Sequence, residues 1–143
     1  MAKRKANAVW EGDLKRGKGE ISVESGAFTG KYSFSSRFED GKGTNPEELL
    51  GAAHAGCYSM ALSADLSQAG YTVDEIRTEA TVTVEKLEGG FEITGIKLVT
   101  HAKVPGIDMK EFSEYASGAK KNCPVSKALA AVENIQLEAH LLK

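Results

Sequence analysis

The sequence is poor in the residues that build metal centres and disulfide frameworks. Its 143 residues include only two cysteines, Cys57 and Cys123, and three histidines. The cysteines stand far apart and neither belongs to a C-x-x-C pair, so the chain lacks the ligand spacing of a zinc site. A structural disulfide is not expected either, because a reducing cytoplasm keeps thiols free. We expect no metal and no cofactor.

Long apolar runs and a strong charge of one sign are also missing. The formal net charge is -2, which gives no attraction for nucleic acid or for a membrane surface. No stretch reaches the roughly 18 uncharged residues of a spanning helix, and no apolar run follows Lys3-Arg4-Lys5 as it would in a signal peptide. We therefore expect a cytoplasmic protein that binds neither nucleic acid nor membranes, with one domain over residues 1–143.

One segment, from Gly43 to Asp65, predicts a central helix. Asn45 can cap its start, Pro46 suits the first helical position, and Glu48 stands where a capping-box carboxylate reaches back. The residues that follow are apolar or small, which is typical of a helix packed on most sides. The sequence predicts a buried helix with Cys57 in its middle.

Alternating apolar residues predict strands on both sides of this helix, at residues 6–10, 19–24, 31–38, 75–86, 91–104 and 133–142. Two further helices are expected between the last two strands, one capped by Asp108 and a short one that begins at Cys123-Pro124. Helices segregated from mostly antiparallel hairpins give an α+β fold.

The two cysteines stand in positions that favour thiol chemistry. Cys57 lies among small residues, so its surroundings are tightly shaped. Cys123 precedes Pro124 at a helix start, where a thiolate is favoured. Arg37 stands near the end of the predicted strand, just before the loop into the central helix, and a guanidinium can hold a thiolate or a peroxide oxygen.

Four runs of this sequence resemble the OsmC family of peroxidases, within the wider OsmC/Ohr superfamily: residues 10–19, 37–39, 43–57 and 122–126. The similarity extends nearly from end to end. It implies an α+β OsmC-like fold in which antiparallel sheets wrap around long central helices in an intertwined homodimer. Active sites would then lie at the subunit interface.

The resemblance also implies a role for each candidate residue. Cys57 would attack an organic hydroperoxide, and hydrogen peroxide less well, and Cys123 would condense with the sulfenic acid to form a disulfide. Arg37 would lower the pKa of Cys57 and orient the peroxide, and Glu47 would hold Arg37 in place. An external dithiol reductant, of the lipoyl type, would complete the cycle. Candidates to line an apolar pocket for the alkyl group are Tyr32, Phe34, Phe38 and Met60.

Helix geometry adds a constraint. Glu47 and Cys57 are ten residues apart on one predicted helix, so they are separated by roughly 15 Å at about 1.5 Å per residue. If both serve one site, either the helix is broken or Glu47 comes from the partner subunit. We predict the second arrangement.

Two other functions are compatible with the same residues. A hydrolase would use Cys57 with His54 and Glu47, and would not need Cys123. A non-enzymatic member of the fold would bind an apolar ligand in the interface cleft. His54, at i−3 from Cys57, can in principle act as its base. We favour a packing role for His54, with its ring bonded to the backbone.

Overall fold

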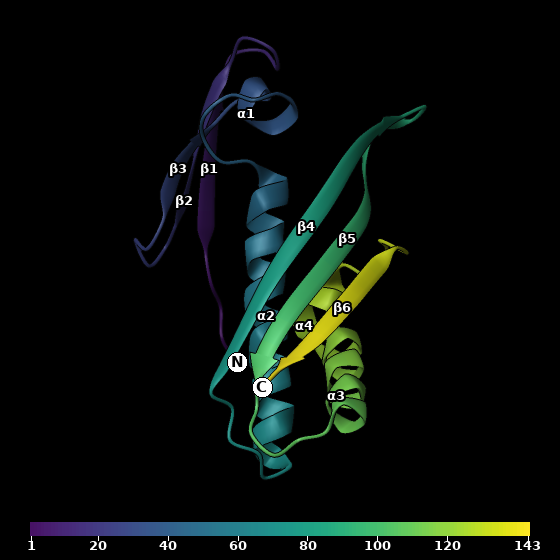
Figure 1. Cartoon of the computed structure of the whole chain (residues 1–143). Helices are drawn as coiled ribbons and strands as arrows, with labels where there is room; N and C mark the ends of the chain where they lie inside the picture. The colour runs from purple at the N-terminus through teal and green to yellow at the C-terminus, as the bar shows by residue number, and fades with distance from the viewer. The chain divides into compact units, whose positions relative to one another are not determined.

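The computed structural model describes all 143 residues, which form two compact units, residues 1–49 and 50–143. The ten helices and strands are labelled in Figure 1. None of the helices is both long enough and apolar enough to cross a membrane.

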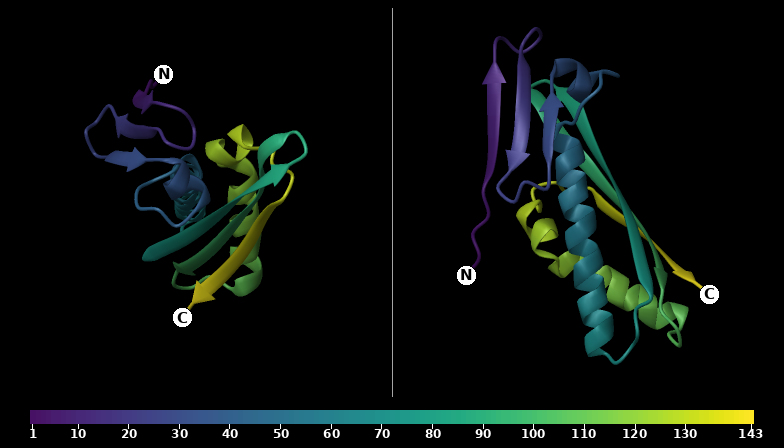
Figure 2. Two further views of the ribbon diagram at one scale, coloured as in Figure 1. Left: turned by 90° about the horizontal axis from the view of Figure 1, so that it is seen from above. Right: turned by 90° about the vertical axis from the view of Figure 1, so that its left-hand side faces the viewer.

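The first unit contains a three-stranded antiparallel sheet in the order β1-β2-β3, with bounds Ala6–Glu11, Lys18–Val23 and Thr29–Tyr32. The right-hand view of Figure 2 shows the three strands side by side, from purple to blue. The three strands predicted before the central helix are thereby confirmed, although the third ends earlier than expected.

A short helix, α1 (Phe34–Phe38), replaces the predicted end of that strand. Ser33 caps it, because its hydroxyl accepts the N–H of Ser36 while the Ser36 hydroxyl accepts the N–H of Ser33. This reciprocal pairing satisfies backbone groups that a strand would have directed to a neighbour. The strand predicted over residues 31–38 is therefore wrong beyond Tyr32, and Arg37 lies in the last turn of a helix.

The central helix, α2 (Pro46–Gln68), is unbroken and starts where the sequence predicts. The side-chain oxygen of Asn45 accepts the N–H of Glu48 at 2.7 Å, which is the expected cap. The capping box is not formed, because the Glu48 carboxylate accepts the Thr44 hydroxyl at 2.8 Å instead. Beyond the helix Gly70 takes a φ of +94°, a conformation that favours glycine.

The second unit holds a mixed sheet in the order β4-β5-β6, with bounds Glu75–Leu87, Gly90–Lys103 and Ile135–Leu142. β4 and β5 form the predicted antiparallel hairpin, whereas β6 pairs with β5 in parallel. The connection between these two parallel strands carries two helices, α3 (Met109–Asn122) and α4 (Pro124–Ala128). The α+β class is confirmed, but the expectation of antiparallel sheets is wrong for β6, because a crossover connection returns the chain in the same direction.

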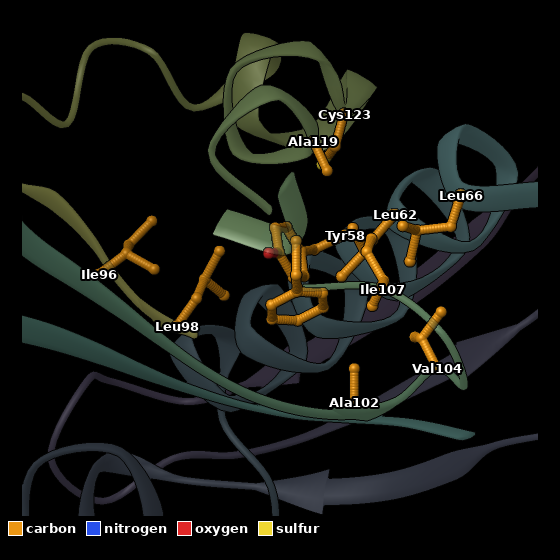
Figure 3. Close-up of a cluster of buried hydrophobic side chains, with 11 residues drawn as sticks. Tyr58, Leu62, Leu66, Ile96, Leu98, Ala102, Val104, Ile107, Ala119 and Cys123 are labelled. Atoms are coloured by element: carbon orange, nitrogen blue, oxygen red, sulfur yellow. The ribbon is translucent and has the colours of Figure 1, made fainter. Parts of the chain in front are cut away.

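The core of the second unit lies where α2 and α3 meet one face of this sheet. Side chains from α2, β5 and α3 converge there (Figure 3). The Tyr58 hydroxyl, fully buried, donates to the carbonyl oxygen of Ala116 at 3.1 Å and so ties α2 to α3. Cys123 belongs to this core and is fully buried.

Candidate active site

Arg37 and Glu47 form an ion pair in the first unit. Nε of Arg37 donates to both carboxylate oxygens, at 3.0 and 3.1 Å, and Nη2 donates to Oε1 at 2.7 Å. The Glu47 side chain is only 7% exposed, so Arg37 compensates for much of the solvent contact that this carboxylate lacks. These contacts use Nε and Nη2, which leaves Nη1 to donate to another acceptor. The structure thus brings together the two residues that the resemblance paired.

A pocket of about 230 Å³ adjoins Arg37 in the same unit. Its walls are mostly aromatic and apolar: Trp10, Leu14, Tyr32, Ser33, Phe34, Arg37 and Phe38. Three of the four predicted lining residues are among them. Met60 is not, because it is 76% exposed on α2. Trp10 and Leu14, which the sequence analysis did not assign to a pocket, complete the wall.

Cys57 and Cys123 are neighbours in the second unit. Cys57 is half-buried on α2, and Cys123 is buried at the junction of α3 and α4, where it caps both helices. Both thiols are free, and they lie close enough for each to shift the pKa of the other. Two sulfurs that are far apart along the sequence therefore lie within reach of each other.

The surroundings of Cys57 disfavour its thiolate. Burial raises the pKa of the Cys57 thiol, and the adjoining Cys123 raises it further. The backbone N–H of Val125 opposes this change only in part. We expected a lowered pKa for Cys57, but its contacts within the second unit raise the pKa overall. That expectation rested on Arg37, which belongs to the first unit.

Cys123 shows the opposite behaviour. Burial alone would raise the pKa of its thiol, but hydrogen bonds from the hydroxyl and the backbone N–H of Ser126, helped by Cys57 and Val125, lower it overall. The N–H of Ser126 lies 3.3 Å from the sulfur, and the Ser126 hydroxyl oxygen lies 3.4 Å from it. Donors aimed at the sulfur stabilise the charged form. The surroundings of Cys123 therefore favour its thiolate.

His54 is bonded to a side chain and not to the backbone, which corrects our interpretation. Its Nε2 lies 2.7 Å from the hydroxyl oxygen of Ser126. The ring is fully buried, its Nδ1 has no hydrogen-bond partner, and burial lowers its pKa. Ser126 was not singled out from the sequence. Its place three residues after the helix cap at Cys123 is the signal that could have identified it.

The family model described as OsmC-like protein matches residues 39–138 of this chain. The chain belongs to the OsmC family. The similarity predicted from the four sequence runs is thereby confirmed. The matched range includes Glu47, Cys57 and Cys123, and it begins just after Arg37.

Two curated relatives show how far this OsmC-family chain resembles known proteins. It is 53% identical over 129 residues to Peroxiredoxin OsmC of Escherichia coli strain K12, which covers 90% of each chain. It is 33% identical over 97 residues to the organic hydroperoxide resistance protein OhrB of Bacillus subtilis strain 168, which covers 67% of this chain and 69% of OhrB.

Solved structures share the OsmC-like fold. The crystal structure of Bacillus subtilis OhrB superposes with a TM-score of 0.71 at 26% identity, over 96% of this chain and 98% of OhrB. An OsmC-like protein from Mycoplasma pneumoniae reaches a TM-score of 0.73 at 17% identity and supports the fold alone.

Proposed function

We propose that this chain is a cofactor-free thiol peroxidase that reduces organic hydroperoxides, and hydrogen peroxide less well. The observation that carries the proposal is the neighbouring pair of free thiols, Cys57 and Cys123, in a chain 53% identical to Peroxiredoxin OsmC. A half-buried thiol beside a buried one is the arrangement that peroxide reduction followed by disulfide formation needs.

In the first step the Cys57 thiolate attacks the outer oxygen of the hydroperoxide. A sulfur–oxygen bond forms, the oxygen–oxygen bond breaks, and the alkoxide leaves with the bonding pair and takes up a proton to become an alcohol. Cys57 is oxidised to sulfenic acid. Arg37 would donate from Nη1 to the peroxide and stabilise the thiolate, since Glu47 already holds its Nε and Nη2.

In the second step the Cys123 thiolate attacks the sulfenic sulfur, and hydroxide leaves as water once it takes up a proton. A dithiol of the lipoyl type would then reduce the disulfide and be oxidised to its own disulfide. Free thiols suit a reducing compartment, and we place this cycle in the cytoplasm.

The complete site would be shared between two subunits of a homodimer. α2 is unbroken, so Glu47 and Cys57 of one chain are held ten residues apart on a rigid element, roughly 15 Å by helix rise. Side chains do not span that distance easily. The Arg37–Glu47 pair of one subunit would therefore serve the thiols of the other, in the intertwined arrangement expected from the family.

The pocket beside Arg37 supports a preference for alkyl hydroperoxides. Its aromatic and aliphatic walls would take up an apolar substituent, while the guanidinium at its edge would meet the peroxide oxygens. Hydrogen peroxide has no such substituent and gains nothing from these walls.

In the hydrolase alternative His54 would serve Cys57 as a base, but its Nε2 lies against the hydroxyl of Ser126, which neighbours Cys123. A non-enzymatic protein would keep its affinity for apolar ligands after Cys57→Ser, whereas a peroxidase would lose turnover.

The proposed function is tested by the consumption of cumene hydroperoxide and of hydrogen peroxide with a dithiol supplied. We expect faster turnover with cumene hydroperoxide, and none above background for Cys57→Ser. Turnover near the wild-type level in Cys57→Ser would refute the peroxidase assignment.

A further inference from the structure

A buried chain of three side chains leads from α2 to the sulfur of Cys123. Nε2 of His54 lies 2.7 Å from the Ser126 hydroxyl oxygen, which lies 3.4 Å from the Cys123 sulfur. His54 and Cys123 are fully buried and Ser126 is 6% exposed. Nothing in the peroxidase cycle above uses His54 or the Ser126 hydroxyl.

Ser126 approaches the sulfur with two separate groups. Its backbone N–H donates to the Cys123 sulfur at 3.3 Å, as part of the cap of α4. While Cys123 is a thiol, its S–H donates to the Ser126 hydroxyl oxygen. Once the thiol ionises, the hydroxyl can rotate and become a second donor to the same sulfur. A substitution that removes the hydroxyl keeps the backbone donor, so the two contributions are separable by mutation.

The unpartnered Nδ1 determines which neutral tautomer His54 adopts. With its proton on Nδ1, the neutral ring would bury an N–H that has no acceptor. With its proton on Nε2, it leaves only a lone pair unpartnered and donates to the Ser126 oxygen. The second form is the less costly one, and burial disfavours a charged ring.

We propose that His54 and Ser126 are a positioning pair for Cys123. The neutral ring of His54 donates its Nε2–H to the Ser126 oxygen, and the Ser126 hydroxyl then donates to the Cys123 thiolate as it attacks oxidised Cys57. His54 never exchanges a proton with substrate or sulfur. Its contribution is to orient the hydroxyl. This inference rests on the proposed function and concerns its second step only.

The step balances without another reactant. The Cys123 thiolate forms a sulfur–sulfur bond with the Cys57 sulfur while the sulfur–oxygen bond of the sulfenic acid breaks. Hydroxide leaves with that bonding pair and takes up the proton that the Cys123 thiol released, which gives water. Cys123 is oxidised by one electron equivalent and the Cys57 sulfur is reduced by one.

The other titratable side chains that act on Cys123 belong to α2. Cys57 lies beside it, and the pKa of Tyr58 is raised by burial and then by the charge of the Cys123 thiolate. Neither supplies the donor that the Ser126 hydroxyl provides.

The test measures disulfide formation alone. Reduced protein is mixed with stoichiometric cumene hydroperoxide, quenched at intervals, and resolved by intact mass into sulfenic acid and disulfide forms. The wild type is compared with Ser126→Ala, His54→Leu and His54→Gln over a range of pH. Glutamine places an amide N–H near the position of Nε2 but cannot relay a proton.

We expect Ser126→Ala and His54→Leu to convert sulfenic acid to disulfide roughly ten-fold more slowly, because the thiolate loses an aligned hydrogen bond. The rise of this rate with pH should also move to higher pH. A purely structural defect would lower the rate without moving that rise. His54→Gln should stay within about three-fold of wild type.

Ser59→Ala is the matched control. Its hydroxyl also lies on α2, but it bonds the carbonyl oxygen of Ala55 and the Thr78 hydroxyl, both at 2.8 Å. We expect its disulfide step to be unchanged.

Two results would overturn the inference: a wild-type rate and pH profile in Ser126→Ala, or a rate in His54→Gln as low as in His54→Leu. Failure of the wild type itself to pass from sulfenic acid to disulfide would instead refute the proposed function. The two failures are thus distinguishable.

Discussion

The thiols of Cys57 and Cys123 are neighbours, yet only Cys57 is partly open to solvent. The partners therefore differ in access as well as in pKa, which burial raises for Cys57 and the Ser126 donors lower for Cys123. This asymmetry separates their roles. In the proposed cycle a peroxide from solvent would reach Cys57 first, and the buried Cys123 would react in the second step.

Cys123→Ser should allow the first oxidation but block disulfide formation. The sulfenic acid on Cys57 would then persist and climb to the sulfinic and sulfonic acids as hydroperoxide is added. Mass spectrometry of the peptide that contains Cys57 should show two or three added oxygens, where the wild type shows a disulfide. Normal recycling of this variant with dithiol would make Cys123 a structural residue.

The reductant should attack the sulfur of Cys57. Cys123 is fully buried, and as the thiol with the lowered pKa it is also the better leaving group. When the oxidised protein is treated with a small monothiol and an alkylating agent, we expect the monothiol on Cys57 and the alkyl group on Cys123. Peptide mapping that finds the reverse would contradict this assignment.

Arg37→Ala should reduce both activity and stability. Because the substitution leaves the buried Glu47 carboxylate without its ion-pair partner, we expect the free energy of unfolding to fall by about 1–3 kcal/mol. Urea denaturation measures this change. The double variant Arg37→Ala, Glu47→Gln should recover most of that stability but not the rate of hydroperoxide reduction. Recovery of both would show that Arg37 acts only through folding.

Glu48→Gln is the control for this pair, because Glu48 neighbours Glu47 but bonds Thr44 instead. Its effect on peroxidase activity should be small.

Stability should fall in mild acid because of His54. Burial holds the pKa of this ring below its ordinary value of 6.5, so below pH 6.5 the unfolded chain binds a proton that the native chain does not. The free energy of unfolding should therefore decrease as pH falls, by up to about 1.4 kcal/mol per pH unit, until the lowered pKa is reached. His54→Gln should flatten this slope. His101 is exposed, so His101→Gln should leave the slope unchanged. Equal slopes in the wild type, His54→Gln and His101→Gln would show that His54 does not cause the pH dependence.

Much of the fold follows from local sequence signals. Asn45 and Pro46 mark the start of α2, alternation marks β4 and β5, and Pro124 marks Cys123 as a helix cap. The short helix α1 was missed because its aromatic residues alternate like a strand, and only the Ser33–Ser36 pair distinguishes it.

Other features depend on contacts between distant residues. The bond between His54 and Ser126 joins positions 72 residues apart, and no local pattern predicts it. Similarly, the parallel pairing of β6 depends on how the α3–α4 connection crosses the sheet. The pKa of Cys57 follows from burial against Cys123, which is again a tertiary effect.

The parallel pairing of β5 with β6 also determines when, during folding, the sulfurs of Cys57 and Cys123 come together. Cys123 lies on the connection between β5 and β6. These two strands are far apart along the chain, and pairing of distant segments is slow. During synthesis, Ile135–Leu142 emerges from the ribosome after the other five strands. We expect a nascent chain that lacks this strand to keep its cysteines apart, so that both react readily with an alkylating reagent. Protection of Cys123 should appear only once Ile135–Leu142 has paired with β5.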